Sequence, residues 1–143
     1  MLKDVSQALN ELHSIGIYHL DVKPENIIMV GDTYKLCDFG SVLSRTIDFD
    51  SIGQDEKDDV IEYITYNSTE IYRPPELINP YGKVIGAPAD IWMLGCIAYI
   101  LAHGKHPVEK GELDAIVNYN IEFPMKPGFL VEITEQLMAY EAY

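Results

Sequence analysis

A polar run, H-L-D-V-K-P-E-N at residues 19–26, is the feature that most constrains the fold, because it lies between two segments of clear periodicity. The segment before it predicts a helix ending near Gly16, since its apolar residues share one helix face: Val5, Ala8, Leu9 and Leu12. After it, residues 27–30 and 33–36 predict two short strands joined by a two-residue turn. The run is therefore expected to be a loop between two rigid elements, an arrangement that suits functional side chains.

The run carries a carboxylate at Asp21, an ammonium at Lys23 and an amide at Asn26. Asp38 follows twelve residues after Asn26, in the triplet D-F-G. Together these four side chains provide what phosphoryl transfer needs: a carboxylate to orient a hydroxyl, a cation for the transferred group and two oxygen ligands for magnesium. Each of them alone is more often a turn residue or a helix cap. Coincidence is a poor explanation for all four in this order.

The pattern H-x-D-x-x-x-x-N followed by D-F-G resembles the catalytic loop and the metal-binding segment of eukaryotic protein kinases. The lysine two residues after Asp21 resembles the serine/threonine version of that loop. The resemblance implies that Asp21 is the catalytic base and that Lys23 neutralises charge on the transferring phosphoryl group. It also implies that Asn26 and Asp38 hold Mg²⁺, and that Lys23, Asn26 and Asp38 contribute to the ATP site.

Further residues match landmarks of the same family in the same order. His19 resembles the histidine that packs beneath Phe39, a structural role in place of acid–base chemistry. Thr69 resembles the threonine of the substrate-binding loop that contacts the catalytic aspartate. Glu76 ends the motif P-P-E, which resembles the A-P-E that closes the activation segment. Asp90 resembles the aspartate of the central helix that accepts hydrogen bonds from the backbone of the catalytic loop.

A finer resemblance is to the numb-associated kinases, which include adaptin-associated and cyclin-G-associated members. It rests on C-D-F-G-S at 37–41, Y-R-P-P-E-L at 72–77 and A-D-I-W-M-L-G-C at 89–96. That family is associated with clathrin-coated vesicle traffic and the actin cortex. The resemblance therefore implies endocytic or actin-cortex partners in addition to ATP and a protein substrate.

Composition restricts the class of protein. At 143 residues the chain is one domain at most, and its net charge of −13 argues against binding nucleic acid or an anionic membrane. No apolar run reaches transmembrane length and the first residues lack the apolar core of a signal peptide, so a cytoplasmic location is expected. Cys37 and Cys96 lie in apolar stretches and are expected to be small core residues.

The rest of the chain is expected to be mainly helical, with one long exception. Residues 38–76 show little periodicity and carry an acidic stretch, which predicts a solvated loop or, as the alternative, a regulated or substrate-selecting activation segment. Pro88 is expected to open an apolar central helix that Gly104 ends. Shorter helices are expected at 112–118 and 130–143.

The chain departs from the kinase pattern in three ways. Leu20 replaces the arginine that pairs with a phosphorylated activation loop, so an intact enzyme is expected not to need that phosphorylation. No G-x-G-x-x-G occurs among the ten glycines, and only eighteen residues precede the polar run. Neither arginine, Arg45 or Arg73, follows Glu76, whose usual partner is an arginine. Glu76 is therefore either solvated, or its partner lies beyond Tyr143.

These observations predict that residues 1–143 are a partial protein kinase domain. The fold expected is the mainly α-helical large lobe with a short β-hairpin, without the small lobe and the last helix of the large lobe. The function expected is transfer of the ATP γ-phosphate to serine or threonine hydroxyls, with little or no activity of the 143-residue chain on its own. The alternative is a non-catalytic, kinase-like docking or scaffold module that uses an exposed apolar surface.

Overall fold

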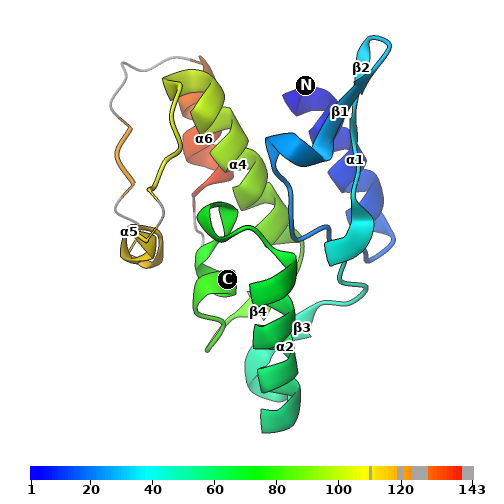
Figure 1. Ribbon diagram of the computed structural model, residues 1–143, viewed down its shortest axis with the longest axis vertical. Helices are drawn as coiled ribbons and strands as arrows, with labels where there is room; N and C mark the ends of the chain where they lie inside the picture. Colours follow the sequence, from blue (N-terminus) through cyan, green and yellow to red (C-terminus); the bar gives the residue numbers. More distant parts are fainter. Residues whose placement is uncertain (110, 119–120, 124–128, 140–143) are drawn as a thin grey trace.

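The structure, a computed structural model, describes residues 1–109, 111–118, 121–123 and 129–139. Its long helices are α1 (Leu2–Ser14), α2 (Gln54–Asn67), α4 (Ala87–His103) and α6 (Phe129–Leu137), with the short helices α3 (Pro75–Ile78) and α5 (Leu113–Val117). Two antiparallel strand pairs complete it: β1 (Ile27–Val30) with β2 (Thr33–Leu36), and β3 (Ile47–Asp48) with β4 (Val84–Ile85). The expected mainly helical fold with a small hairpin is therefore confirmed (Figure 1).

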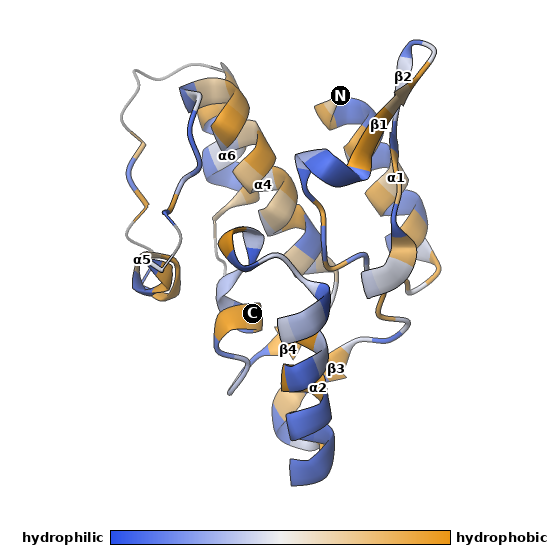
Figure 2. Ribbon diagram, viewed as in Figure 1, coloured by the Kyte–Doolittle hydropathy of each residue, from blue (hydrophilic) through white to orange (hydrophobic). Residues whose placement is uncertain are grey.

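Helix α4 is the centre of the core. Its sequence is apolar nearly all round, and Figure 2 shows hydrophobic colours over most of its length. Pro88 lies in the first turn, where its missing N–H is not needed, and Gly104 ends the helix in the left-handed conformation. Both predicted ends are confirmed. Helices α1 and α6 pack against α4, whose residues 92–99 are all buried, so this helix holds the two halves of the described chain together.

Helix α1 and the β1–β2 hairpin frame the polar run. Val5 and Leu9 on α1 are fully buried, as the predicted helix face requires, and α1 packs on both β2 and α4. The hairpin pairs Ile27 with Leu36, and Gly31 has a φ of 62°, which a two-residue turn demands and glycine adopts without strain. The predicted strands and the predicted loop between rigid elements are both confirmed.

The expectation of a solvated loop over residues 38–76 is wrong in its middle, where α2 runs from Gln54 to Asn67. Its surface is largely hydrophilic (Figure 2), so its narrow apolar side is difficult to recognise from periodicity. Ile64 is the buried residue of that side, and Val60 packs on the same core. Residues Asp55 and Glu56 in the first turn favour the helix by complementing its dipole.

The last two helices lie where they were predicted, but α6 is shorter than predicted. Helix α5 lies within the predicted 112–118. Helix α6 ends at Leu137, whereas a helix over 130–143 was expected; Met138 and Ala139 are not helical, and 140–143 lie outside the described residues. In the part of the chain that the structure describes, no helix combines the length and the apolar character needed to span a bilayer.

Candidate active site

Asp21 lies at the centre of a hydrogen-bond cluster built by two segments far apart in sequence. Its Oδ1 accepts hydrogen bonds from the Thr69 amide at 2.9 Å and the Thr69 hydroxyl at 2.7 Å. Its Oδ2 lies 2.7 Å from Nζ of Lys23 and accepts a hydrogen bond from Nδ2 of Asn26 at 3.1 Å. Asp21 is only 6 % exposed, so both oxygens are held in fixed directions by these donors.

These donors decide the ionisation of Asp21. Burial by itself raises the pKa of Asp21, but hydrogen bonds from Lys23 and Thr69, together with the positive charge of Lys23, outweigh burial and lower the pKa below its ordinary value. Asp21 is therefore a carboxylate at neutral pH. A carboxylate can receive or orient a hydroxyl proton, and the ammonium of Lys23 beside it can attract an anionic group to the same place.

Asp90 fixes the backbone of the loop. It is fully buried on α4, and its two carboxylate oxygens each accept one backbone hydrogen bond at 2.8 Å, from the N–H of His19 and from the N–H of Leu20. The imidazole of His13 lies 2.8 Å from the same carboxylate. These hydrogen bonds attach the backbone of the two residues preceding Asp21 to the rigid central helix. Leu20 adopts a left-handed conformation with a φ of 59°, which the two hydrogen bonds to Asp90 help to hold.

His19 is held by its neighbours as one tautomer. Its Nδ1 accepts a hydrogen bond from the backbone N–H of Asp21 at 3.3 Å, and its Nε2 faces the carbonyl oxygen of Cys37 at 3.1 Å. A carbonyl only accepts, so Nε2 carries the proton. The ring also packs on Phe39, with centroids 5.3 Å apart. With both nitrogens engaged and its side chain fully buried, His19 links the loop to the D-F-G segment.

Asn26 and Asp38 are brought to the same end of the hairpin. Asn26 directly precedes β1 and Cys37 directly follows β2, and the Cys37 backbone N–H and thiol both donate to the carbonyl oxygen of Asn26. The two residues therefore lie next to the end pair of the hairpin, Ile27 with Leu36, and Asp38 is one residue further. Nδ2 of Asn26 donates to Asp21, which leaves Oδ1 as the amide oxygen able to bind a cation. The Asp38 carboxylate is exposed and caps Gly40 through one oxygen. These hard oxygen donors fit Mg²⁺.

Arg73 has a role that the sequence reasoning missed. Its guanidinium donates to the carbonyl oxygens of Thr65 and Ser68 and to the Ser68 hydroxyl, at 3.0, 2.7 and 2.8 Å. It thereby satisfies orphan carbonyls at the C-terminal end of α2, directly before Thr69. His13 was missed as well. It lies four residues after buried Leu9 on α1, and that spacing was the available signal.

Glu76 differs from one of the two expectations for it. The side chain is not solvated, because it is only 5 % exposed. Burial raises the pKa of this carboxyl, although the charge of nearby Lys83 acts in the opposite direction. Cys96 is fully buried and confirmed as a core residue, whereas Cys37 is half-buried at the site.

Comparison with known proteins supplies the family. Residues 1–137 match the family described as "Protein kinase domain". The chain is 35 % identical over 133 residues to Actin-regulating kinase 1 of Saccharomyces cerevisiae, covering 90 % of this chain and 20 % of that protein. It is 35 % identical over 136 residues to Serine/threonine-protein kinase sel-5 of Caenorhabditis elegans, covering 91 % of this chain and 12 % of that protein.

A third relative has a different acceptor specificity in its name. Dual specificity protein kinase Ttk of Danio rerio is 31 % identical over 138 residues, covering 87 % of this chain and 13 % of that protein. The chain thus spans between 12 % and 20 % of the length of these three relatives.

Proposed function

This chain belongs to the protein kinase domain family, and on that basis we propose that the protein containing it transfers the γ-phosphoryl group of ATP to serine or threonine hydroxyls of a protein substrate. One observation carries the proposal. A buried carboxylate, Asp21, is kept ionised by Lys23 and Thr69, with the ammonium of Lys23 at 2.7 Å. Phosphoryl transfer needs this pair, a proton acceptor for the nucleophile and a cation for the transferred group.

In the proposed reaction, Asp21 accepts a hydrogen bond from the substrate hydroxyl and thereby orients its oxygen toward the phosphoryl group. Lys23 stabilises the negative charge on that group as it moves. Thr69 and Asn26 hold the two carboxylate oxygens of Asp21 in place, so the acceptor position exists before the substrate arrives. His19 and Asp90 position the loop and do not touch the reacting atoms.

Asn26 and Asp38 are the residues proposed to hold Mg²⁺ with ATP. When bound, the ion would supply positive charge that offsets the negative charge developing on the transferred group. Asn26 reaches this position because its amide nitrogen is anchored on Asp21, and Asp38 because it follows the hairpin.

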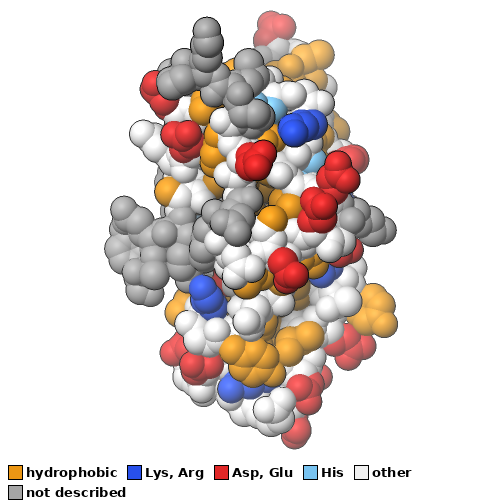
Figure 3. All heavy atoms as spheres, turned by 90° about the vertical axis from the view of Figure 1, so that its left-hand side faces the viewer, with side chains coloured by type: hydrophobic (Ala, Val, Ile, Leu, Met, Phe, Trp, Pro, Cys, Tyr) orange, Lys and Arg blue, Asp and Glu red, His pale blue; other side chains and the backbone are white. Residues whose placement is uncertain are grey.

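The finer assignments are also proposals. Lys23 and the serine/threonine kinase relative support serine and threonine as acceptors, whereas the dual specificity relative makes tyrosine the alternative. The motifs that resemble numb-associated kinases, together with a yeast relative named for regulating actin, support endocytic or actin-cortex partners. Acidic side chains are spread over the face shown in Figure 3, in agreement with the net charge of −13; this supports a protein substrate over nucleic acid. Use of ATP supports a cytoplasmic location.

The test compares two isosteric substitutions in the protein that contains the chain. Asp21→Asn should reduce phosphate transfer from labelled ATP to a peptide library by about three powers of ten, because it removes the proton acceptor. Asp32→Asn removes the same charge from an exposed position in the hairpin turn and should leave the rate unchanged. Parallel libraries with serine, threonine or tyrosine acceptors settle the acceptor. Undiminished transfer by the Asp21 variant would refute the assignment.

A docking or scaffold module is the second candidate, and one observation favours it. Strand β1 exposes three consecutive apolar side chains, Ile28, Met29 and Val30, each 46 to 66 % exposed. Apolar surface of this kind commonly contacts another protein or domain. Under this candidate the Asp21→Asn protein keeps every binding partner of the wild type, and the wild type has no measurable transfer. Measurable transfer by the wild type would reject it as the main function.

A further inference from the structure

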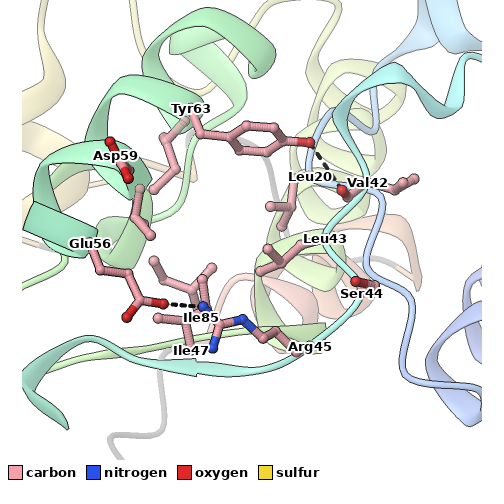
Figure 4. A pocket seen from close by; sticks show the side chains of 12 residues that line it. Leu20, Val42, Leu43, Ser44, Arg45, Ile47, Glu56, Asp59, Tyr63 and Ile85 are labelled. Atoms are coloured by element: carbon pink, nitrogen blue, oxygen red, sulfur yellow. Dashed lines mark hydrogen bonds and ion pairs between the residues drawn. The ribbon is translucent and has the colours of Figure 1, made fainter. Parts of the chain in front are cut away.

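A cavity of about 370 Å³ lies beside α2, and the residues of the Asp21 cluster do not line it (Figure 4). Its walls come from four parts of the chain that meet only in the folded state: the loop before Asp21, the segment after D-F-G as far as β3, the inner side of α2, and β4. The wall is largely aliphatic, with side chains from Leu20, Leu43, Ile47, Val60, Ile64 and Ile85. Figure 4 shows the labelled side chains, Leu20, Leu43, Ile47 and Ile85 among them, arranged around an open centre.

The polar groups at the edge of the cavity are engaged with one another. Arg45 forms an ion pair with Glu56, and the Tyr63 hydroxyl donates to the carbonyl oxygen of Val42 at 3.0 Å (Figure 4). Arg45 is the one cation among the described lining residues, and its charge is already balanced. The other charged lining residue, Asp59, repels anions. The cavity therefore offers no unbalanced positive charge to a ligand.

Leu20 contributes an apolar side chain to the cavity wall at a position where the kinase pattern has a charged one. In the kinase pattern that residues 19–26 resemble, this position is an arginine that pairs with a phosphate. Here a leucine that is only 2 % exposed lines the wall instead. A phosphate in this cavity would lose its hydration without gaining a cation, which is strongly unfavourable. A neutral apolar molecule has no charge to dehydrate, so it does not incur this desolvation cost.

We propose that this cavity is a binding site for a small, neutral, apolar molecule of about the size of a substituted aromatic ring. The volume lies within the range of small-molecule sites, and such sites are lined mainly by apolar side chains. The aliphatic part of the wall offers water few hydrogen-bond partners, so an apolar molecule placed there replaces poorly held water at little cost. The proposal rests on the cavity and its lining, and it stands whether or not the protein transfers phosphate.

The experiment titrates the protein that contains the chain, labelled with ¹³C at leucine, isoleucine and valine methyl groups. Three probes are used in turn: toluene, benzoate and inorganic phosphate. Toluene should shift the methyl signals of Leu20, Leu43 and Ile85 in a saturable way. Benzoate, which adds a carboxylate to the same ring, should bind at least about tenfold more weakly because its charge has no partner. Phosphate should shift none of them.

Two phenylalanine substitutions on α2 form a matched pair. Val60→Phe fills the cavity and should abolish the saturable shifts, whereas Ile61→Phe adds the same ring at the neighbouring, exposed position and should leave them intact. Circular dichroism checks that each variant is folded, and Leu43→Phe fills the cavity from the opposite segment should Val60→Phe fail that check. Absence of saturable shifts with toluene, tighter binding of phosphate, or unchanged shifts in a folded cavity-filled variant would overturn the proposal.

Discussion

The Thr69 hydroxyl lies 2.7 Å from Oδ1 of Asp21, although the two residues are 48 positions apart in the chain. The Thr69 amide reaches the same oxygen, and Nζ of Lys23 lies 2.7 Å from the Thr69 hydroxyl oxygen. One side chain therefore ties the segment that follows α2 to both charged residues of the candidate site. Correct placement of Asp21 depends on the fold of residues 54–69.

Replacing Thr69 by valine tests this connection, because valine keeps the shape and removes the hydroxyl. Loss of one hydrogen bond to a buried carboxylate should lower kcat in the protein containing the chain by about 10- to 100-fold. Thr69→Ser keeps the hydroxyl and should retain most of the rate. Equal rates for the valine variant and the wild type would show that the Thr69 hydroxyl does not position Asp21.

Asp90→Asn should destabilise the fold by about 2 to 4 kcal/mol, since the carboxylate accepts hydrogen bonds from two backbone N–H groups and also contacts His13. In the asparagine variant the side-chain NH₂ group replaces one carboxylate oxygen, so it faces a backbone N–H group that no longer has an acceptor. Urea unfolding of the wild type and the variant measures the difference. His13→Gln disturbs one contact of the three and should cost clearly less; a larger cost for His13→Gln would contradict this ranking.

Glu76 should make stability depend on pH in a particular direction. Burial raises its pKa in the folded state above the ordinary 4.5, so the folded protein takes up the proton before the unfolded chain does. As pH falls from 7 toward 4.5, the free energy of unfolding should therefore rise in the wild type relative to Glu76→Gln. Urea unfolding of both proteins across this range gives the difference, in which other titrating groups cancel. A constant difference would mean that Glu76 has the same pKa in both states.

Gly95 lets α4 and α6 approach closely. A Cβ at this position would lie 2.5 Å from Cγ of Met138, which is too close for two carbon atoms, and 3.2 Å from Cβ of Leu137, which is a tight contact. Gly95→Ala should therefore cost about 1 to 3 kcal/mol through overpacking. Gly53→Ala is the matched control, because its added Cβ meets nothing within 4 Å.

A double substitution distinguishes crowding from other effects of alanine at Gly95. Combined with Met138→Ala, the Gly95→Ala change should cost less than it does alone, because the crowded side chain has been removed. Thermal unfolding of the four proteins in this cycle gives the coupling. If the two changes in the free energy of unfolding are strictly additive, Met138 does not cause the cost of Gly95→Ala, and α6 shifts away from the added methyl group at little cost.

Activity should be insensitive to removal of phosphate from residues 65–68. Leu20 has no charge to pair with a phosphate, Arg73 is engaged with the end of α2, and Arg45 is paired with Glu56. Phosphatase treatment of the protein that contains the chain should therefore change its activity by less than about twofold. Mass spectrometry before and after treatment verifies the phosphate content, and a loss of tenfold or more would reject the prediction.

Local patterns predicted the elements whose residues contact one another within a few positions. Helix α1, the hairpin and both ends of α4 follow from helix periodicity, a two-residue turn, Pro88 and Gly104. The polar groups of the candidate site could be named as well, because 19–26 and D-F-G lie on either side of one hairpin. Helix α2 was missed because its apolar side is narrow, and this side stabilises the helix only through the packing of Ile64 on the core.

The sequence by itself determined the chemical groups of the site and the short-range elements that carry them, since both depend on neighbours along the chain. Tertiary structure alone decided which distant groups meet: Thr69 with Asp21, Asp90 with the backbone 70 positions before it, and β3 with β4. It also decided that Leu20 lines a cavity. Such contacts form only when burial of the shared core outweighs the entropy of closing long loops, and no local pattern records that balance.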